Sequence, residues 1–145
     1  MAGKVISIEI GYSLTRVWEV DYKSKTHKVY GYFSLPTPEG MINDGILNLN
    51  ETFVADLREA LAEYKMKSKQ VVFTLTSTKI ASREVTIPFV KENRIMDVVN
   101  ANASDYFPVD LSQYQLAYSM LGVTGNPKSG QQYKLLVLAA PQALL

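Results

Sequence analysis

The sequence predicts a mixed α/β fold in which short strands alternate with two amphipathic helices. Three observations predict this fold. Polar and apolar residues alternate through most of residues 4–35, as they do in half-buried strands. Residues 48–64 and 91–106 carry apolar side chains on one helical stripe. Short runs rich in β-branched residues follow each helix, so the predicted order is three strands, a helix, two strands, a helix and two strands.

The first three strands are predicted at 4–10, about 15–22 and 29–35, with Pro36 ending the third. Only short turns separate them. Consecutive strands joined by short turns pair as an antiparallel meander.

Asn48, with Glu51 three residues later, predicts the start of the first helix. Its apolar stripe consists of Phe53, Val54, Leu57, Leu61 and Tyr64. Strands are then expected at 71–77 and 81–87.

The second helix is expected at 91–106, because Pro108 disfavours helical geometry at the residue before it. A strand at 114–123 and a mobile Gly- and Pro-containing loop at 124–132 follow. Residues 133–139 form a continuous apolar run, which is typical of a strand buried on both faces. We expect an uncovered face of that strand to drive self-association, so a homo-oligomer is a further expectation.

Composition excludes several classes of function. The chain has 145 residues, 47% of them hydrophobic and 20% charged, which indicates an ordered globular protein. Its net charge of +1 predicts no nucleic-acid partner, and no run of Lys and Arg suggests anionic lipid. There is no cysteine and only one histidine, His27, so no metal site is predicted. The alternating first ten residues lack the apolar core of a signal peptide, and no stretch is long enough to span a bilayer, which predicts a cytoplasmic protein.

The turn between the first two predicted strands is the one candidate ligand-binding segment in the sequence. Its Gly amides, hydroxyls and cation could hold phosphate oxygens, with Glu9, Gly11, Ser13, Thr15 and Arg16 as the candidate residues. The alternative is an ordinary hairpin turn with its Gly at positive φ, which the residues alone favour because Gly-x-Ser turns are common. No catalytic residues are predicted.

Four segments together resemble the PilM family of type IV pilus assembly proteins, within the actin-like ATPases. The run Ile8 to Val20 is similar to the first phosphate hairpin of those ATPases. Ser82 to Pro88, Ala103 to Val109 and Leu136 to Pro141 are similar to a strand, a helix end and a returning strand of the family. The resemblance covers almost all of this chain but only the first part of the family, which implies an N-terminal portion of the fold.

The resemblance implies an actin-like, ribonuclease H-like fold with an inserted subdomain of the type found in the cell-division protein FtsA. Residues 1–36 with 133–145 would form part of the first actin-like subdomain, and residues 37–132 the insertion. An FtsA-like, ATP-binding division protein is the alternative function.

The resemblance also implies a scaffold at the cytoplasmic face of the inner membrane. Such a protein would bind the cytoplasmic tail of a PilN-like membrane protein and associate with the membrane indirectly. It would contact platform and motor proteins of the type IV pilus machine or of a related type II secretion machine. Which residues would form the peptide groove is not indicated by the sequence.

The chain departs from the family where nucleotide chemistry would occur. Glu9 occupies the position of an aspartate in the family, and Arg16 occupies the position of a lysine. Tyr12 and Leu14 are found where small hydroxyl residues are usual. We therefore expect no cofactor and no ATP hydrolysis in this chain, while ATP with magnesium is implied for a full-length form.

Overall fold

The computed structural model of the chain describes residues 3–23 and 25–145. It divides into two compact units, Met1–Thr76 and Ser77–Leu145, which are described separately here. The first two residues of the expected first subdomain, and Ser24 in the turn expected between the second and third strands, lie outside the described residues.

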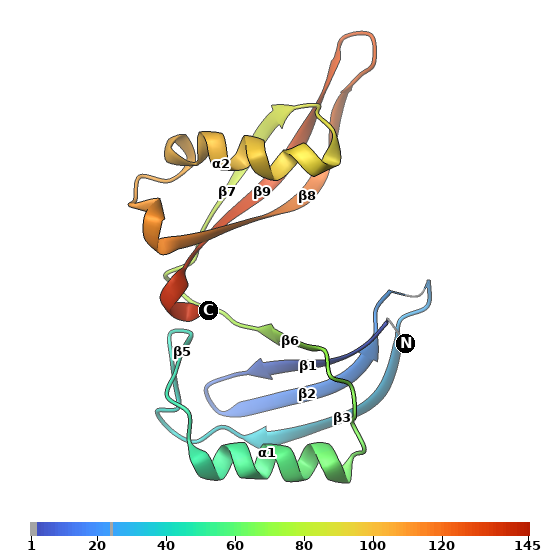
Figure 1. The fold of residues 1–145 in the computed structure, drawn as a ribbon, viewed down its shortest axis with the longest axis vertical. Coiled ribbons are helices and arrows are strands. Elements are labelled where there is room, and N and C mark those ends of the chain that lie inside the picture. Colours follow the sequence, from blue (N-terminus) through green and yellow to red (C-terminus); the bar gives the residue numbers. More distant parts are fainter. Residues whose placement is uncertain (1–2, 24) are drawn as a thin grey trace. The chain divides into compact units, whose positions relative to one another are not determined.

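The first unit is built on a four-stranded sheet (Figure 1). Strands β1 (Lys4–Ile10), β2 (Leu14–Asp21) and β3 (Lys28–Pro36) form the predicted antiparallel meander. Strand β6 (Val71–Thr74) then pairs in parallel with β1, which gives the order β3-β2-β1-β6. The meander is confirmed, whereas the strand expected at 71–77 ends three residues early.

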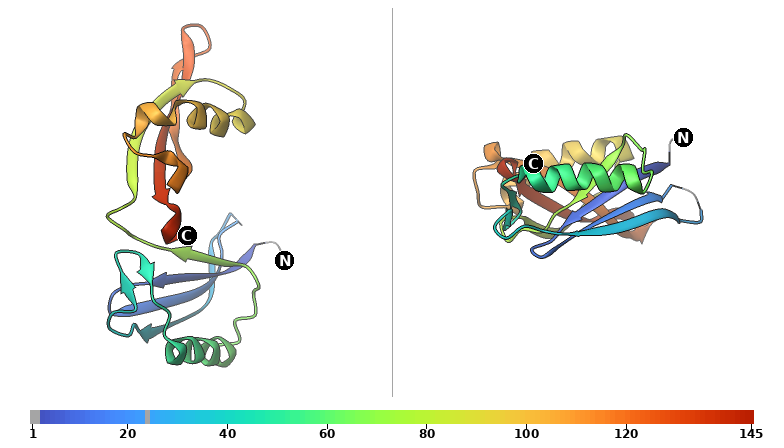
Figure 2. Two further views of the ribbon diagram at one scale, coloured as in Figure 1. Left: turned by 60° about the vertical axis from the view of Figure 1, so that its left-hand side comes forward. Right: turned by 90° about the horizontal axis from the view of Figure 1, so that it is seen from below.

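Helix α1 (Glu51–Glu63) lies against one face of this sheet (Figure 2). The core between them consists of Ile6, Ile8, Val17, Phe33, Ala60 and Met66. The helix begins later than predicted, because its N-cap is Asn50 and not Asn48. The Asn50 side-chain oxygen accepts a hydrogen bond from the Phe53 amide at 3.0 Å, which satisfies one of the free N–H groups of the first turn.

A small hairpin, β4 (Ile42–Asn43) with β5 (Ile46–Leu47), occupies the connection that the sequence left without structure. Its turn places Asp44 and Gly45 at φ of 48° and 86°. Asp and Gly are residues that tolerate this left-handed region.

The second unit is a three-stranded antiparallel sheet covered by one helix. Strands β7 (Ala81–Pro88), β8 (Tyr114–Asn126) and β9 (Gly130–Pro141) are arranged in the order β7-β9-β8. Helix α2 (Ile95–Tyr106) packs on one face. Single 3-10 turns complete the unit at Glu92–Arg94, Leu111–Gln113 and Gln142–Leu144.

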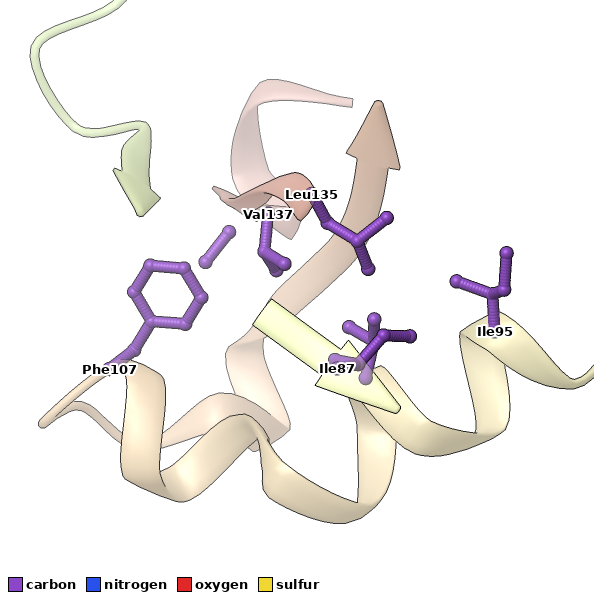
Figure 3. Packing of buried hydrophobic residues seen from close by; sticks show 7 residues of the cluster. Ile87, Ile95, Phe107, Leu135 and Val137 are labelled. Carbon is purple, nitrogen blue, oxygen red and sulfur yellow. The ribbon is translucent and has the colours of Figure 1, made fainter. Parts of the chain in front are cut away.

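The core of this unit forms because α2 and the central strand β9 present apolar residues at matching periods. Ile95, Val99 and Ala103 repeat every four positions on α2, while Leu135, Val137 and Ala139 alternate on β9. These side chains meet Ile87 and Phe107 in one cluster (Figure 3). Leu135, Val137 and Ile95 are fully buried.

Two expectations for the last strand are wrong. Residues 124–132 are not a long loop, since β8 runs to Asn126 and β9 begins at Gly130. Gly125 and Gly130 take φ of 79° and 96° where the strands turn, so these glycines make a tight hairpin. The mobility expected for this segment stays a prediction. The run 133–139 is also not buried on both faces, because Leu136 and Leu138 remain partly exposed.

The expected domain division also differs from the units observed. Strand β9 pairs along its length with β7 and β8, so residues 133–145 belong to the second unit and not with residues 1–36. Conversely, α1 and β6 belong to the first unit, although they fall inside the insertion expected at 37–132. We therefore place the boundary between Thr76 and Ser77.

Helices α1 and α2 span 13 and 12 residues. Within residues 3–23 and 25–145, no helix is both long and apolar enough to cross a bilayer.

Candidate functional site

The predicted hairpin forms one wall of a small pocket in the first unit. The pocket has a volume of about 120 Å³, and its lining comes from three segments of the chain. The β1–β2 hairpin contributes Glu9, Ile10, Gly11 and Tyr12; the β4–β5 hairpin contributes Ile42 and Gly45; Thr74 and Thr76 complete the lining. Parallel strands β1 and β6 both end here, and ligand sites of α/β proteins commonly lie beyond the carboxyl ends of parallel strands.

Gly11 is needed in this hairpin for space and not for an unusual φ. Its φ is not among the positive values of the described residues, so the expectation of a positive-φ glycine is wrong. Its amide instead donates to the Leu14 carbonyl at 3.0 Å, and a Cβ on Gly11 would lie 2.9 Å from that oxygen. The tight turn therefore excludes a side chain at position 11. The Gly11 N–H is used within the turn, so it is not free to donate a hydrogen bond to a phosphate oxygen.

Glu9 and Arg16 are directly opposite each other on β1 and β2. Glu9 Oε1 and Arg16 Nη1 lie 3.4 Å apart, and both side chains are roughly half exposed. A pair this exposed contributes little to stability. Its consequence for the site is electrostatic, because the one cation of the hairpin is already paired with a carboxylate.

Thr15 does not face the pocket. It lies on the α1 face of the sheet, has no exposed surface, and its Oγ1 is 2.8 Å from Oγ1 of Thr37. The Thr37 amide also donates to the Ser13 carbonyl at 3.0 Å, which ties the end of β3 to the hairpin. Thr15 and the Ser13 carbonyl thus hold the hairpin in place, and the Thr15 hydroxyl is not available to a ligand.

Tyr12 links the β1–β2 hairpin to the β4–β5 hairpin. Its ring is 71% exposed, and its hydroxyl accepts a hydrogen bond from the Asp44 amide at 3.2 Å. Tyr12 therefore connects the two hairpins and lines the pocket beside Glu9.

These residues fit the phosphates of ATP poorly. Of the five predicted residues, only Glu9 and Gly11 line the pocket; Arg16 is paired, Thr15 is buried, and Ser13 is exposed outside the pocket lining. A carboxylate without a free cation repels phosphate. Across the described residues, no three acidic or histidine side chains cluster in a way that could hold a metal ion.

Sequence reasoning missed Thr74 and Thr76 as neighbours of Glu9. The register of β1 with β6 places Thr74 opposite Glu9, although the two are far apart in sequence. The only sequence signal was the β-rich run after the first helix, and nothing in that run indicates which strand it will pair with. His27 lies in an exposed segment, as expected, and does not contribute to the pocket.

Two groups with shifted pKa values lie in the second unit, outside the pocket. Burial, helped by the Asp105 charge, raises the pKa of Tyr106. Hydrogen bonds from the Ser112 hydroxyl and the Ser112 amide lower the pKa of Asp110. Asp110 caps the 3-10 turn Leu111–Gln113, which explains its shift without a functional role.

Comparisons with known proteins agree on one family. A family model described as "Type IV pilus assembly protein PilM" matches residues 7–143. A solved structure titled "PilM-PilN type IV pilus biogenesis complex" contains a chain that superposes with a TM-score of 0.72 at 22% sequence identity. The match covers 97% of the present chain and 41% of that one, so the sequence spans about two fifths of the length of this structural relative. No curated protein sequence matches. The structural likeness confirms the mixed α/β, actin-like fold expected from the sequence.

Proposed function

Because this chain belongs to the family of the type IV pilus assembly protein PilM, we propose that it acts as an adaptor in the assembly of type IV pili. The observation that carries this proposal is the family match, which extends over nearly the whole chain. Fold alone would not carry it, since actin-like folds serve many functions.

The proposed partner is the cytoplasmic tail of a PilN-like membrane protein. The solved relative is a complex of PilM with PilN, and the structural match includes almost all of the present chain. Binding such a tail would hold the adaptor at the cytoplasmic face of the inner membrane indirectly. There it would connect the pilus platform with its motor proteins.

We further propose that the chain is not an enzyme. Supporting this are the small pocket, the Glu9–Arg16 ion pair and the buried Thr15 hydroxyl, which together leave no unpaired cation at the hairpin. Phosphoryl-transfer catalysis rests on positive charge and positioned donors around the phosphate groups. Nothing in the structure favours the alternative of an FtsA-like division protein.

The experiment that tests the adaptor role is genetic. Deletion of the gene in its source organism should abolish surface pili while cell division remains normal. Pili should return when the gene is restored on a plasmid, and also when the restored copy carries Arg16→Ala. Filamentous cells with normal pili would contradict the proposal and support the division alternative.

A further inference from the structure

One end of the sheet in the first unit is crowded with lysines. They come from three segments that are far apart in the sequence: the start of β1, the β2–β3 connection with the first residue of β3, and the α1–β6 connection. Together these segments hold seven of the 15 basic residues of the chain, at positions 4, 23, 25, 28, 65, 67 and 69. We call this end of the unit the lysine surface.

The strand pairings bring these segments together. In the register of the sheet, Lys4 on β1 is opposite Asp21 on β2, and Asp21 is opposite Lys28 at the start of β3. On the other side, β1 pairs with β6 through Ile6 and Val71, so the residues just before Val71 lie beside Lys4. Figure 1 shows the start of β1, the β2–β3 connection and the α1–β6 connection at the same end of the sheet.

A groove of about 500 Å³ lies within this surface. Lys4, Lys65, Lys67 and Lys69 line it, together with Glu19, Ser68 and Gln70. The Glu19 carboxylate is buried and already used: Oε1 lies 3.6 Å from Lys4 Nζ, and Oε2 accepts the Ser68 N–H at 3.3 Å. Lys4 is also held over the Tyr30 ring, 4.3 Å from its centroid. The contacts of Lys4 therefore have a structural role. The other three lysines of the groove, Lys65, Lys67 and Lys69, are candidates for binding a ligand.

Those three lysines have no such partner. Among the described residues, no carboxylate forms an ion pair with Lys65, Lys67 or Lys69, and all three are exposed. The negative end of the α1 dipole accounts for a lysine directly after the helix, such as Lys65. That field falls off within a turn, so it does not explain Lys67 and Lys69. Nor does it explain the lysines at the other edge of the sheet.

The chemistry of the surface favours a layer of phosphate groups over a single anion. Each cation is a lysine, which acts as a mobile point charge, whereas fixed bidentate recognition of one phosphate uses arginine. Apolar and aromatic groups border the cations: Tyr22, Val29 and Tyr30 are each at least 50% exposed. Lysines beside tyrosines suit the headgroup region of a bilayer, where the charge meets phosphate and the ring meets the apolar boundary.

We propose that the lysine surface binds the headgroups of an anionic membrane directly. This contact differs from the indirect association through a partner's tail proposed above, and it needs no partner protein. Its failure would leave the adaptor role unaffected.

The test is co-sedimentation of the purified chain with vesicles of phosphatidylglycerol mixed into phosphatidylcholine. The chain should bind these vesicles and not vesicles of phosphatidylcholine alone. The Lys65→Gln/Lys67→Gln/Lys69→Gln variant should bind about 100-fold more weakly, at about fivefold per lysine. Raising the ionic strength from about 0.1 M to about 1 M should release the wild-type chain, because the Debye length falls from about 10 to about 3 Å.

The matched control is Lys79→Gln/Lys91→Gln/Lys128→Gln, which removes the same charge from exposed positions of the second unit. This control should bind like wild type. Equal losses in both triple variants would show that only net charge matters and would overturn the proposal. So would the absence of binding to anionic vesicles, or displacement from them by inorganic phosphate at equal phosphate concentration. All of the substituted lysines are exposed, so unchanged thermal unfolding of each variant will confirm that the fold is intact.

Discussion

Arg16 and Glu9 face each other across the first hairpin, with Nη1 and Oε1 3.4 Å apart. Arg16, the candidate phosphate-binding cation of the hairpin, is thus paired with a carboxylate of the same hairpin. Because Arg16 is neutralised by Glu9, the hairpin offers a phosphate no free positive charge.

The first prediction concerns ATP turnover by the chain. Phosphate release from ATP with magnesium should not exceed the rate in buffer, because the hairpin lacks an unpaired cation. A coupled phosphate assay measures this directly. Steady release by the wild-type chain that is lost in Arg16→Ala would contradict the prediction.

A second prediction concerns the buried hydroxyl pair that holds the hairpin. Thr15 is fully buried and Thr37 is 8% exposed, with their hydroxyl oxygens 2.8 Å apart. Thr15→Val keeps the shape of the side chain but leaves the Thr37 hydroxyl without its partner, so it should lower the free energy of unfolding by about 1–3 kcal/mol. Urea denaturation measures the change.

The matched control for Thr15→Val is Ser13→Ala, an exposed hydroxyl in the same turn, which should change the free energy of unfolding by less than about 0.5 kcal/mol. The double variant Thr15→Val/Thr37→Val should be less destabilised than the sum of the two single changes, because no unpaired hydroxyl remains. Strict additivity would mean that the two hydroxyls do not depend on each other.

Local patterns were sufficient for the first meander and for both helices. Each of these elements shows a hydrophobic pattern that repeats every two residues or about every 3.6 residues within one continuous segment. The alternation of Ile6, Ile8 and Ile10 is an example. The error at the start of α1 arose because Asn48 and Asn50 both suit a cap, and only the backbone decides between them. At 124–132, Gly and Pro indicated a turn correctly but not its length.

What the sequence could not provide was pairing between distant segments. The parallel contact of β6 with β1, which brings Thr74 to Glu9, depends on closing a loop of some sixty residues. The lysine surface was missed for the same reason. Lys4 and Lys69 are neighbours only in the folded sheet, so a search for a continuous basic run does not find them.

The third prediction moves the expected site of self-association. The sequence suggested strand 133–139, but β9 is the central strand of its sheet and α2 covers one face. Strand β6 is instead an edge strand with three exposed apolar residues in succession: Val71, Val72 and Phe73 are 45%, 45% and 60% exposed. Exposed edges of this kind pair with a second chain.

We therefore expect the wild-type chain to sediment as a concentration-dependent oligomer, and Phe73→Lys to shift it to monomer, since lysine on an edge opposes strand pairing. Val123→Lys is the matched control, because Val123 is 50% exposed on β8, the edge of the other sheet. Dissociation by Val123→Lys alone would place the contact between chains on the second unit. A wild-type chain that stays monomeric at all concentrations would contradict the prediction of self-association.

The fourth prediction concerns the carboxylate that caps a 3-10 turn. The Ser112 hydroxyl donates to Asp110 Oδ1 at 2.7 Å and the Ser112 amide at 3.1 Å, and these bonds lower the pKa of Asp110. A lowered pKa means that this contribution to stability is present above the unfolded value of about 3.9 and is lost as pH falls through the folded value.

Ser112→Ala removes the hydroxyl, which is the larger cause, so the pKa of Asp110 should rise toward its ordinary value. Carbon-detected NMR of the carboxyl group across acidic pH measures this shift. Ser104→Ala, an exposed serine on α2, should leave it unchanged. An Asp110 titration that is the same in Ser112→Ala and in wild type would contradict the assignment.

Calorimetric titration of the chain with the cytoplasmic tail of the PilN-like protein from the same organism tests the adaptor role most directly. We predict saturable binding of the tail peptide, no binding of a scrambled peptide of the same composition, and an affinity that ATP with magnesium does not change. Absence of binding by the tail, together with saturable binding of ATP, would contradict the account.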